Sequence, residues 1–121
     1  MSESLFSPPG GFRVRIYDLS GGAAEGVVEE IAGFTSLMHA NAFARAYVRD
    51  SIERCRTPGL SAAEVLALWR QFGEDCEVLG GHPNAWRSAD EVGRFAARPA
   101  TAEERDWRAL DPRRLAEAED E

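Results

Sequence analysis

The residues best suited to chemistry stand where a helix-like segment passes into a strand-like one. Glu74 and Asp75 follow Gly73 directly, and His82 lies shortly afterwards in the loop sequence GGHPN. Carboxylates near an imidazole serve general acid–base catalysis and ligand binding. The chain between them spans up to about 20 Å when extended, so these groups meet only if the chain bends back. We therefore expect a solvated corner at Glu74 and Asp75, with a hydrolase or small-ligand site of the three residues as the alternative.

The cysteines and the second histidine lack the spacing of a metal site or an activated thiol. Zinc ligands generally occur in pairs about two to four residues apart, whereas Cys55 and Cys76 are widely separated. Both lie in apolar patterns, where a free cysteine packs as a small hydrophobic residue. His39 falls in the first turn of an expected helix, and we expect it at the surface. The sequence thus predicts no metal site, no cofactor and no catalytic residue.

A strand-like segment offers a candidate binding face. In residues 12–19, FRVRIYDL, the side chains of Arg13, Arg15 and Tyr17 alternate with apolar ones and so share a face. Two guanidinium groups beside an aromatic ring can stack a nucleic-acid base or hold carboxylates. If the face binds, an acidic peptide suits it better than RNA does. We expect instead that acids of a neighbouring strand, such as Glu29, neutralise the arginines.

Composition excludes several classes of function. All fourteen basic residues are arginine, which excludes a lysine-containing phosphate loop and Schiff-base chemistry. A net charge of −7 at pH 7 disfavours nucleic acid, so a weak single-strand binder acting through Arg13, Arg15 and Tyr17 is a second alternative only. No stretch approaches the ~20 apolar residues of a membrane span, and the N-terminus lacks a signal-peptide pattern. We expect a cytoplasmic protein without membrane contact.

Two strands begin the ordered part of the chain. Residues 12–19 and 27–34 both alternate between apolar and polar side chains. Their short connection favours antiparallel pairing, because a parallel crossover needs a longer one. On the second strand we expect Val28, Ala32 and Phe34 to lie on the buried face.

A long helix follows over residues 37–56, with Thr35 or Ser36 as its cap. Its apolar positions recur at helical spacing and predict one buried stripe. The members of this stripe are Ala40, Phe43, Ala44, Tyr47, Val48, Ser51, Ile52 and Cys55.

Capping boxes are expected to start three further helices. In such a box a Ser or Thr and a Glu three residues later each accept the other's backbone N–H. The pairs are Ser61 and Glu64, Ser88 and Glu91, and Thr101 and Glu104. For the first of these helices we expect a buried face, an end at a left-handed Gly73, and a strand over 76–80 beyond it. The buried face comprises Val65, Leu68, Trp69 and Phe72.

The order of these elements predicts an α+β fold. It is a small, mostly antiparallel three-stranded sheet with helices packed on one face, in the order β-β-α-α-β-α with a helical C-terminal tail. We expect a flexible arm over residues 1–11, a single domain over 12–98 and an acidic helical tail over 99–121. Residues 101–121 carry eight acids and four arginines, a charge typical of a solubilising tail.

Two runs, GFTSLMHANAFARAYVRDSIERC and PGLSAAEVLALWRQFGEDCEVLG, resemble a group of small bacterial proteins of unknown function. The shared pattern is a Gly-Phe strand end, an Ala-rich helix and a Phe-Gly-Glu-Asp corner, within residues 12–80. The resemblance implies an α+β fold and a soluble bacterial protein, and no reaction. The chain departs from the group at Cys76, where proline is usual, and at LSGGAAEG, where an acidic, aromatic stretch is usual. If the group carries a ligand site in that stretch, this chain has lost or altered it.

Aromatic residues outside the main helices favour an interaction module. Trp86 lies in a loop, and Trp107 and Leu110 lie on the expected tail helix. Exposed indoles on such segments are uncommon without a use, so each either packs across the domain or meets a partner. We favour a small non-enzymatic interaction or regulatory module that self-associates as a homodimer. An acidic peptide or protein is a further possible partner.

Overall fold

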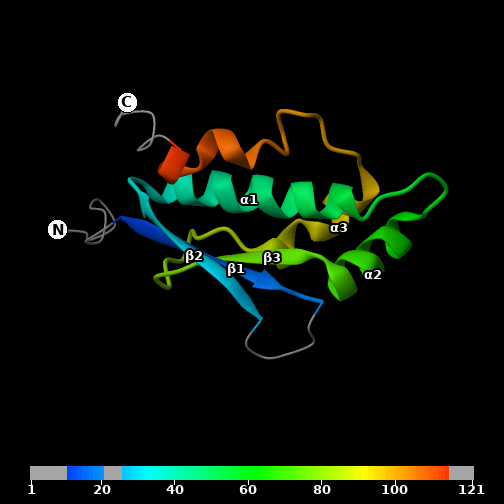
Figure 1. The fold of residues 1–121 in the computed structure, drawn as a ribbon, viewed down its shortest axis with the longest axis horizontal. Helices are drawn as coiled ribbons and strands as arrows, with labels where there is room; N and C mark the ends of the chain where they lie inside the picture. The colour runs from blue at the N-terminus through cyan, green and yellow to red at the C-terminus, as the bar shows by residue number, and fades with distance from the viewer. Residues whose placement is uncertain (1–10, 21–25, 115–121) are drawn as a thin grey trace.

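The computed structural model describes residues 11–20 and 26–114 (Figure 1). The elements in chain order are β1 (Phe12–Asp18), β2 (Val27–Phe34), α1 (Leu37–Arg54), α2 (Ala62–Phe72), β3 (Glu74–Val78), the 3-10 turn η2 (Ser88–Asp90), α3 (Val92–Ala97) and the 3-10 turn η3 (Trp107–Leu110). The described residues contain no helix that is both long and apolar enough to span a membrane.

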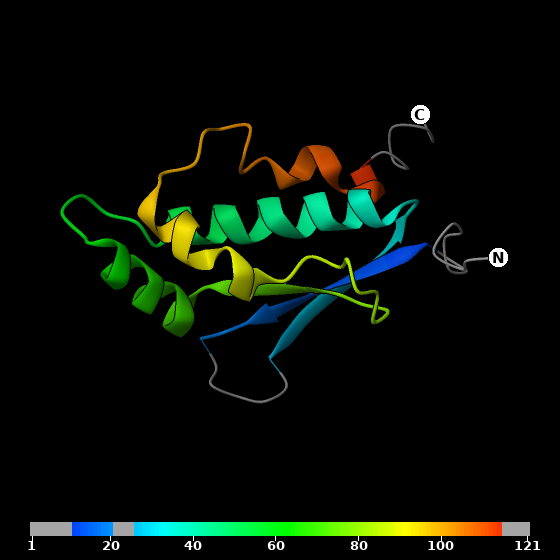
Figure 2. The same ribbon diagram turned by 180° about the vertical axis from the view of Figure 1, so that it is seen from behind.

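The three strands form one antiparallel sheet in the order β2-β1-β3. Helix α1 packs on one face of this sheet, and η3 lies on the far side of α1, as both views show (Figures 1 and 2). Helix α2 stands at one end of the sheet and contacts α3. The predicted α+β class, with a small antiparallel sheet and this element order, is confirmed.

The predicted buried face of β2 is wrong in part. Ile31 and Phe34 are buried, whereas Val28 is 52% exposed and Ala32 is also exposed. The register explains the change, because Phe12 pairs with Phe34 and Val14 with Ile31, so β2 carries one extra residue between the two pairs. A bulge of this kind switches the face that later side chains occupy.

Helix α1 supplies the centre of the core. Ser36 is its cap, since its side-chain oxygen accepts the backbone N–H of His39. All members of the predicted stripe are buried except Cys55, which is half-buried. His39 is half-buried rather than exposed, because its Nε2 donates to the carbonyl of Leu110 at 2.7 Å and its ring meets the edge of Phe34.

Helix α2 begins as predicted but ends differently. Both hydrogen bonds of the box of Ser61 and Glu64 are present. Gly73 is extended, with φ −88° and ψ −167°, not left-handed. A side chain there would place its Cβ 2.2 Å from Cδ1 of Trp69, so the position needs glycine for space rather than for backbone freedom. Phe72, predicted to be buried, is 65% exposed.

The other two predicted boxes depart from the pattern. Ser88 makes no capping hydrogen bond, and its hydroxyl donates to Asp75 instead. Thr101 and Glu104 do form both bonds of a box, but turns follow and not a helix. At Ser88, a partner distant in sequence, Asp75, outweighs the local capping pattern. At Thr101, the path of the chain towards α1 outweighs it.

The C-terminal segment, residues 99–114, lies along α1. Asp50 of α1 accepts hydrogen bonds from Arg105 Nε at 2.7 Å and Trp107 Nε1 at 3.2 Å. Further along, Arg113 forms an ion pair with Glu29 of β2. The predicted division at residue 98 stays a prediction, and residues 115–121 of the predicted tail, like most of the predicted arm over 1–11, fall outside the described residues.

Candidate functional site

Glu74 and Asp75 do not form a solvated corner. They are the first two residues of β3, so their side chains leave opposite faces of the sheet. The Glu74 carboxylate accepts from the hydroxyl of Tyr47 at 2.7 Å and lies 3.7 Å from Arg54, both on α1. The corner prediction failed because the strand starts directly at the end of α2. The two acids therefore cannot act as a pair.

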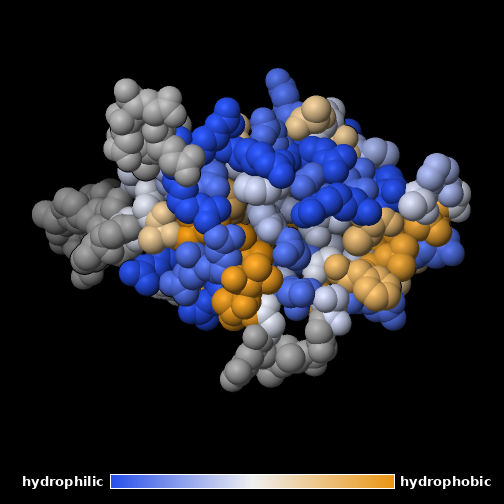
Figure 3. All heavy atoms as spheres, in the orientation of Figure 1, coloured by the Kyte–Doolittle hydropathy of each residue, from blue (hydrophilic) through white to orange (hydrophobic). Residues whose placement is uncertain are grey.

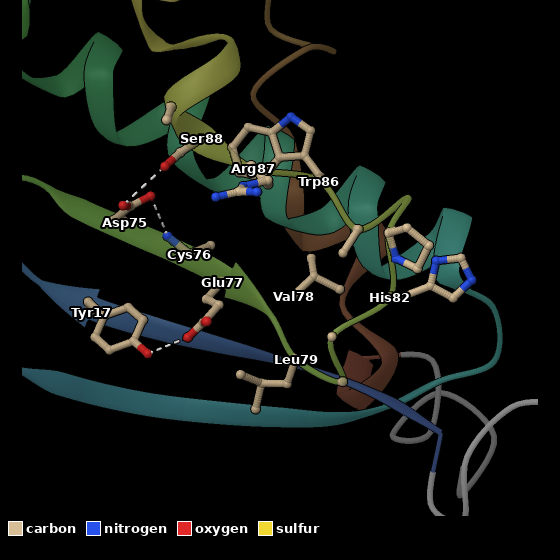
Figure 4. Close-up of a pocket in the computed structure, with 15 residues that line it drawn as sticks. Tyr17, Asp75, Cys76, Glu77, Val78, Leu79, His82, Trp86, Arg87 and Ser88 are labelled. Atoms are coloured by element: carbon tan, nitrogen blue, oxygen red, sulfur yellow. Dashed lines mark hydrogen bonds between the residues drawn. The ribbon is translucent and has the colours of Figure 1, made fainter. Parts of the chain in front are cut away.

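The chain bends back after β3 and borders an open hollow. Gly80 and Gly81 have φ of +111° and +70°, a conformation that glycine adopts without strain, and they reverse the chain. The returning segment forms a bridge between Arg87 and Glu77. The hollow, of about 630 Å³, lies between β3 and this segment (Figure 4). It is lined by Tyr17 and by residues 75–83 and 85–89.

Asp75 is the half-buried acid of the hollow. Its carboxylate accepts the hydroxyl of Ser88 at 3.1 Å and the backbone N–H of Cys76 at 2.8 Å (Figure 4). Burial raises the pKa of Asp75 above the ordinary value, and the nearby charge of Glu77 adds to the rise. The two hydrogen bonds oppose that shift without cancelling it.

Tyr17 is the one member of the predicted strand face that lines the hollow. Its hydroxyl donates to Glu77 at 2.6 Å, and this bond to a carboxylate raises the pKa of the tyrosine. Arg13 and Arg15 both bind Glu30, each at 3.1 Å. A cross-strand acid thus neutralises the arginines as expected, but the acid is Glu30 and not Glu29.

His82 and Arg87 complete the polar lining. His82 Nδ1 accepts the backbone N–H of Asn84 at 3.0 Å, which leaves Nε2 for another partner. Arg87 is exposed, and within residues 11–20 and 26–114 its guanidinium forms no ion pair. Figure 4 shows His82 at the end of the hollow away from Asp75. The structure therefore brings Asp75 and His82 to one hollow, without a direct hydrogen bond, and keeps Glu74 out of it.

The tryptophans predicted to meet a partner pack within the domain. Trp86 stacks on Phe95, and its Nε1 donates to Glu91 at 2.7 Å. Trp107 lies 4.9 Å from the ring of Tyr47, measured between ring centroids. Leu110 is half-buried against the core. In Figure 3 the apolar atoms of the visible face form separate areas divided by hydrophilic atoms.

Sequence reasoning missed Glu77, Arg87 and Ser88 as parts of the hollow. The local pattern favours Ser88 as a helix cap, and neither Glu77 nor Arg87 belongs to a motif. The one available signal is the pair of glycines, which predicts a reversal and therefore a segment returning along β3. Burial raises the pKa of the Cys76 thiol well above its ordinary value, which makes it unreactive. Among the residues described, no group of three acids, cysteines or histidines is placed to bind a metal ion.

Comparison with known proteins finds no matching family model, no matching curated protein and no matching solved structure. The arguments for a function therefore come from the fold and from the side chains of the hollow.

Proposed function

We propose that this protein is a small-ligand-binding domain and that the hollow beside β3 is its binding site. The observation that carries the proposal is a half-buried acid, Asp75, in a hollow of about 630 Å³ that also contains a guanidinium without an ion pair, Arg87. Binding sites for small molecules are typically concave, largely apolar and provided with a few convergent polar groups.

The lining indicates the chemistry of the ligand. Asp75 and Glu77 supply carboxylates, and Arg87 supplies one guanidinium, so the formal charge of these three groups is negative. Val78, Leu79 and Pro83 supply apolar surface. A small molecule with an amine or hydroxyl donor at one end and an apolar part fits this arrangement better than an anion does. An ammonium group near Asp75 would also favour the charged carboxylate that burial disfavours.

Binding is better supported than catalysis. A hydrolase with a serine nucleophile and a histidine base requires contact between the two, and no hydrogen bond connects His82 to Ser88 in the described residues. Ser88 donates to Asp75 itself, which positions both groups for ligand recognition. The interaction module favoured by the sequence loses one of its supports, because Trp86 and Trp107 donate hydrogen bonds inside the domain. The homodimer stays a prediction.

Binding is tested by native mass spectrometry and thermal-shift measurements against small amines, amino acids and polyols. We expect at least one amine or polyol to bind the wild-type protein and Asp75→Asn to weaken that binding about tenfold or more. Arg87→Ala is expected to leave the binding of an amine unchanged or to strengthen it, because the guanidinium repels an ammonium group. Asp106→Asn is the matched control, since Asp106 is exposed and outside the hollow. An absence of binding by every compound, or equal effects of the Asp75 and Asp106 variants, would overturn the proposal.

A further inference from the structure

Arg49 is a buried charge whose hydrogen-bonding capacity is largely unused. The residue is 7% exposed, and its Nε is buried without a hydrogen-bond partner among the described residues. A guanidinium carries five N–H donors, and buried polar groups are nearly always paired. Its closest acid is Glu104, whose Oε1 lies 3.5 Å from an NH2 nitrogen of Arg49. This single long ion pair leaves the fork of donors largely free.

The surroundings hold the guanidinium in place. Arg49 lies over the ring of Phe95, with 4.8 Å between its Cζ and the ring centroid. Arg45, one helical turn earlier, lies 5.3 Å from the same centroid. Glu91 binds Arg45 through two hydrogen bonds of 2.7 and 3.0 Å. Arg45 is therefore fully paired with an acid, whereas Arg49 beside it is not.

Glu104 approaches Arg49 from the solvent side. Its side chain is 42% exposed, and the oxygen nearest Arg49 also accepts the backbone N–H of Thr101 at 2.9 Å. That N–H bond lowers the pKa of Glu104, and the charges of Arg49 and Arg98 lower it further. Glu104 of the C-terminal segment thus lies near the charges of Arg49 and Arg98, while its carboxylate accepts its hydrogen bond from the backbone N–H of Thr101.

We propose that Arg49 forms a binding site for one oxyanion group, a carboxylate or a phosphate, which Glu104 occupies in part from within the chain. The planar fork of a guanidinium binds both kinds of group through two parallel hydrogen bonds. The exposure of Glu104 leaves an approach from solvent, so an external anion can take the place of this internal carboxylate. The site is separate from the hollow, and neither Arg45 nor Arg49 lines the latter.

The test follows the arginine Nε–Hε resonances by NMR while inorganic phosphate or acetate replaces chloride at constant ionic strength. We expect the Arg49 resonance to shift saturably and Arg70, an exposed arginine of α2, to remain unshifted. Glu104→Gln removes the internal competitor and is expected to tighten binding about threefold or more. A larger response to phosphate identifies phosphate-bearing ligands, and a larger response to acetate identifies acidic peptides.

A matched pair of variants separates the hydrogen bonding of the Arg49 guanidinium to an anion from the effect of its positive charge. Arg49→Lys retains the charge and loses the fork, so anion binding is expected to weaken about tenfold, with Arg70→Lys as the control. The proposal is overturned if the Arg49 resonance stays unshifted with both anions, or if Glu104→Gln binds no more tightly than the wild type. Both of these results come from the wild type and Glu104→Gln, so they can be measured even if Arg49→Lys fails to fold.

Discussion

At the scale of single residues, the space around Gly73, and not its backbone conformation, prevents a larger side chain at that position. Gly73 has ordinary extended dihedrals, yet Trp69 occupies the space that a side chain would need. The same indole donates from Nε1 to the carbonyl of Glu74 at 3.0 Å and so connects the end of α2 to the start of β3. The helix-to-strand junction therefore depends on one glycine and one tryptophan.

Gly73→Ala is expected to destabilise the fold by about 2–3 kcal/mol, because the added methyl group overpacks a site bounded by Trp69. Urea unfolding measures the change. Gly93→Ala in α3 is the matched control, since nothing lies within 4 Å of the place that its Cβ would take and alanine favours helix. Equal destabilisation by both variants would contradict the packing argument.

Asp75 makes the stability of the protein depend on pH. The pKa of Asp75 is raised in the folded protein. Between the ordinary value of 3.8 and this raised pKa, the folded protein therefore binds more protons than the unfolded chain. Stability contributed by Asp75 is therefore greatest at low pH and falls as the pH rises through the folded pKa. Asp75→Asn removes this loss, so we expect the stability of the variant relative to wild type to increase from pH 4 to pH 7.

Urea unfolding at a series of pH values checks this expectation, with Asp106→Asn as the reference. Parallel stability curves for wild type and Asp75→Asn across the range would show that Asp75 titrates normally.

At the scale of elements, a half-buried arginine joins two helices. Arg56, just beyond α1, donates to the carbonyls of Phe95 and Ala96 at 2.8 and 2.9 Å, which lie at the C-terminal end of α3. It also binds Glu53, whose side chain is almost fully buried. These bonds satisfy terminal carbonyls of a helix of only six residues, which could not hold its position by itself.

Arg56→Met is expected to destabilise the protein by about 2–3 kcal/mol, because it leaves two carbonyls and a buried carboxylate unpaired. Arg54→Met, two residues earlier, removes only longer ion pairs of a 55% exposed side chain and is expected to change stability by less than about 1 kcal/mol. Chemical denaturation compares the two, and similar losses would exclude the proposed role of Arg56.

At the scale of the whole molecule, the C-terminal segment covers the side of α1 that faces away from the sheet (Figure 1). Trp107 packs on Tyr47 and Phe43, and Asp50 binds Arg105 and Trp107. Helix α1 is consequently buried from two sides, which accounts for buried residues around much of its circumference, including Ala46 and Arg49.

A chain that ends at Arg98 is expected to lose at least about 3 kcal/mol of stability, because Trp107 and its contacts with α1 are removed. A chain that ends at Arg114 keeps the contacts of Arg105, Trp107 and Arg113 and is the reference for this comparison. Thermal and urea unfolding provide the comparison. Full stability of the chain ending at Arg98 would instead support an independent domain over residues 12–98.

The sequence by itself determined the fold class and the elements with the strongest local signals, namely β1, α1 and the start of α2. Alternation in 12–19, the helical stripe of α1 and the box at Ser61 are signals between residues within a few positions of each other, and each survives in the structure. Such signals reflect the local geometry of strands and helices, which tertiary packing here reinforces.

Only the tertiary structure decided how the polar residues are paired. Ser88 lies thirteen residues from Asp75, and Glu104 lies more than fifty residues from Arg49, so no local pattern connects them. The bulge in β2 also reassigned its buried face, because one extra residue against β1 reverses the side-chain directions that alternation predicts. The hollow and the arginine site exist because distant segments meet, and their contacts are determined by packing of the whole chain.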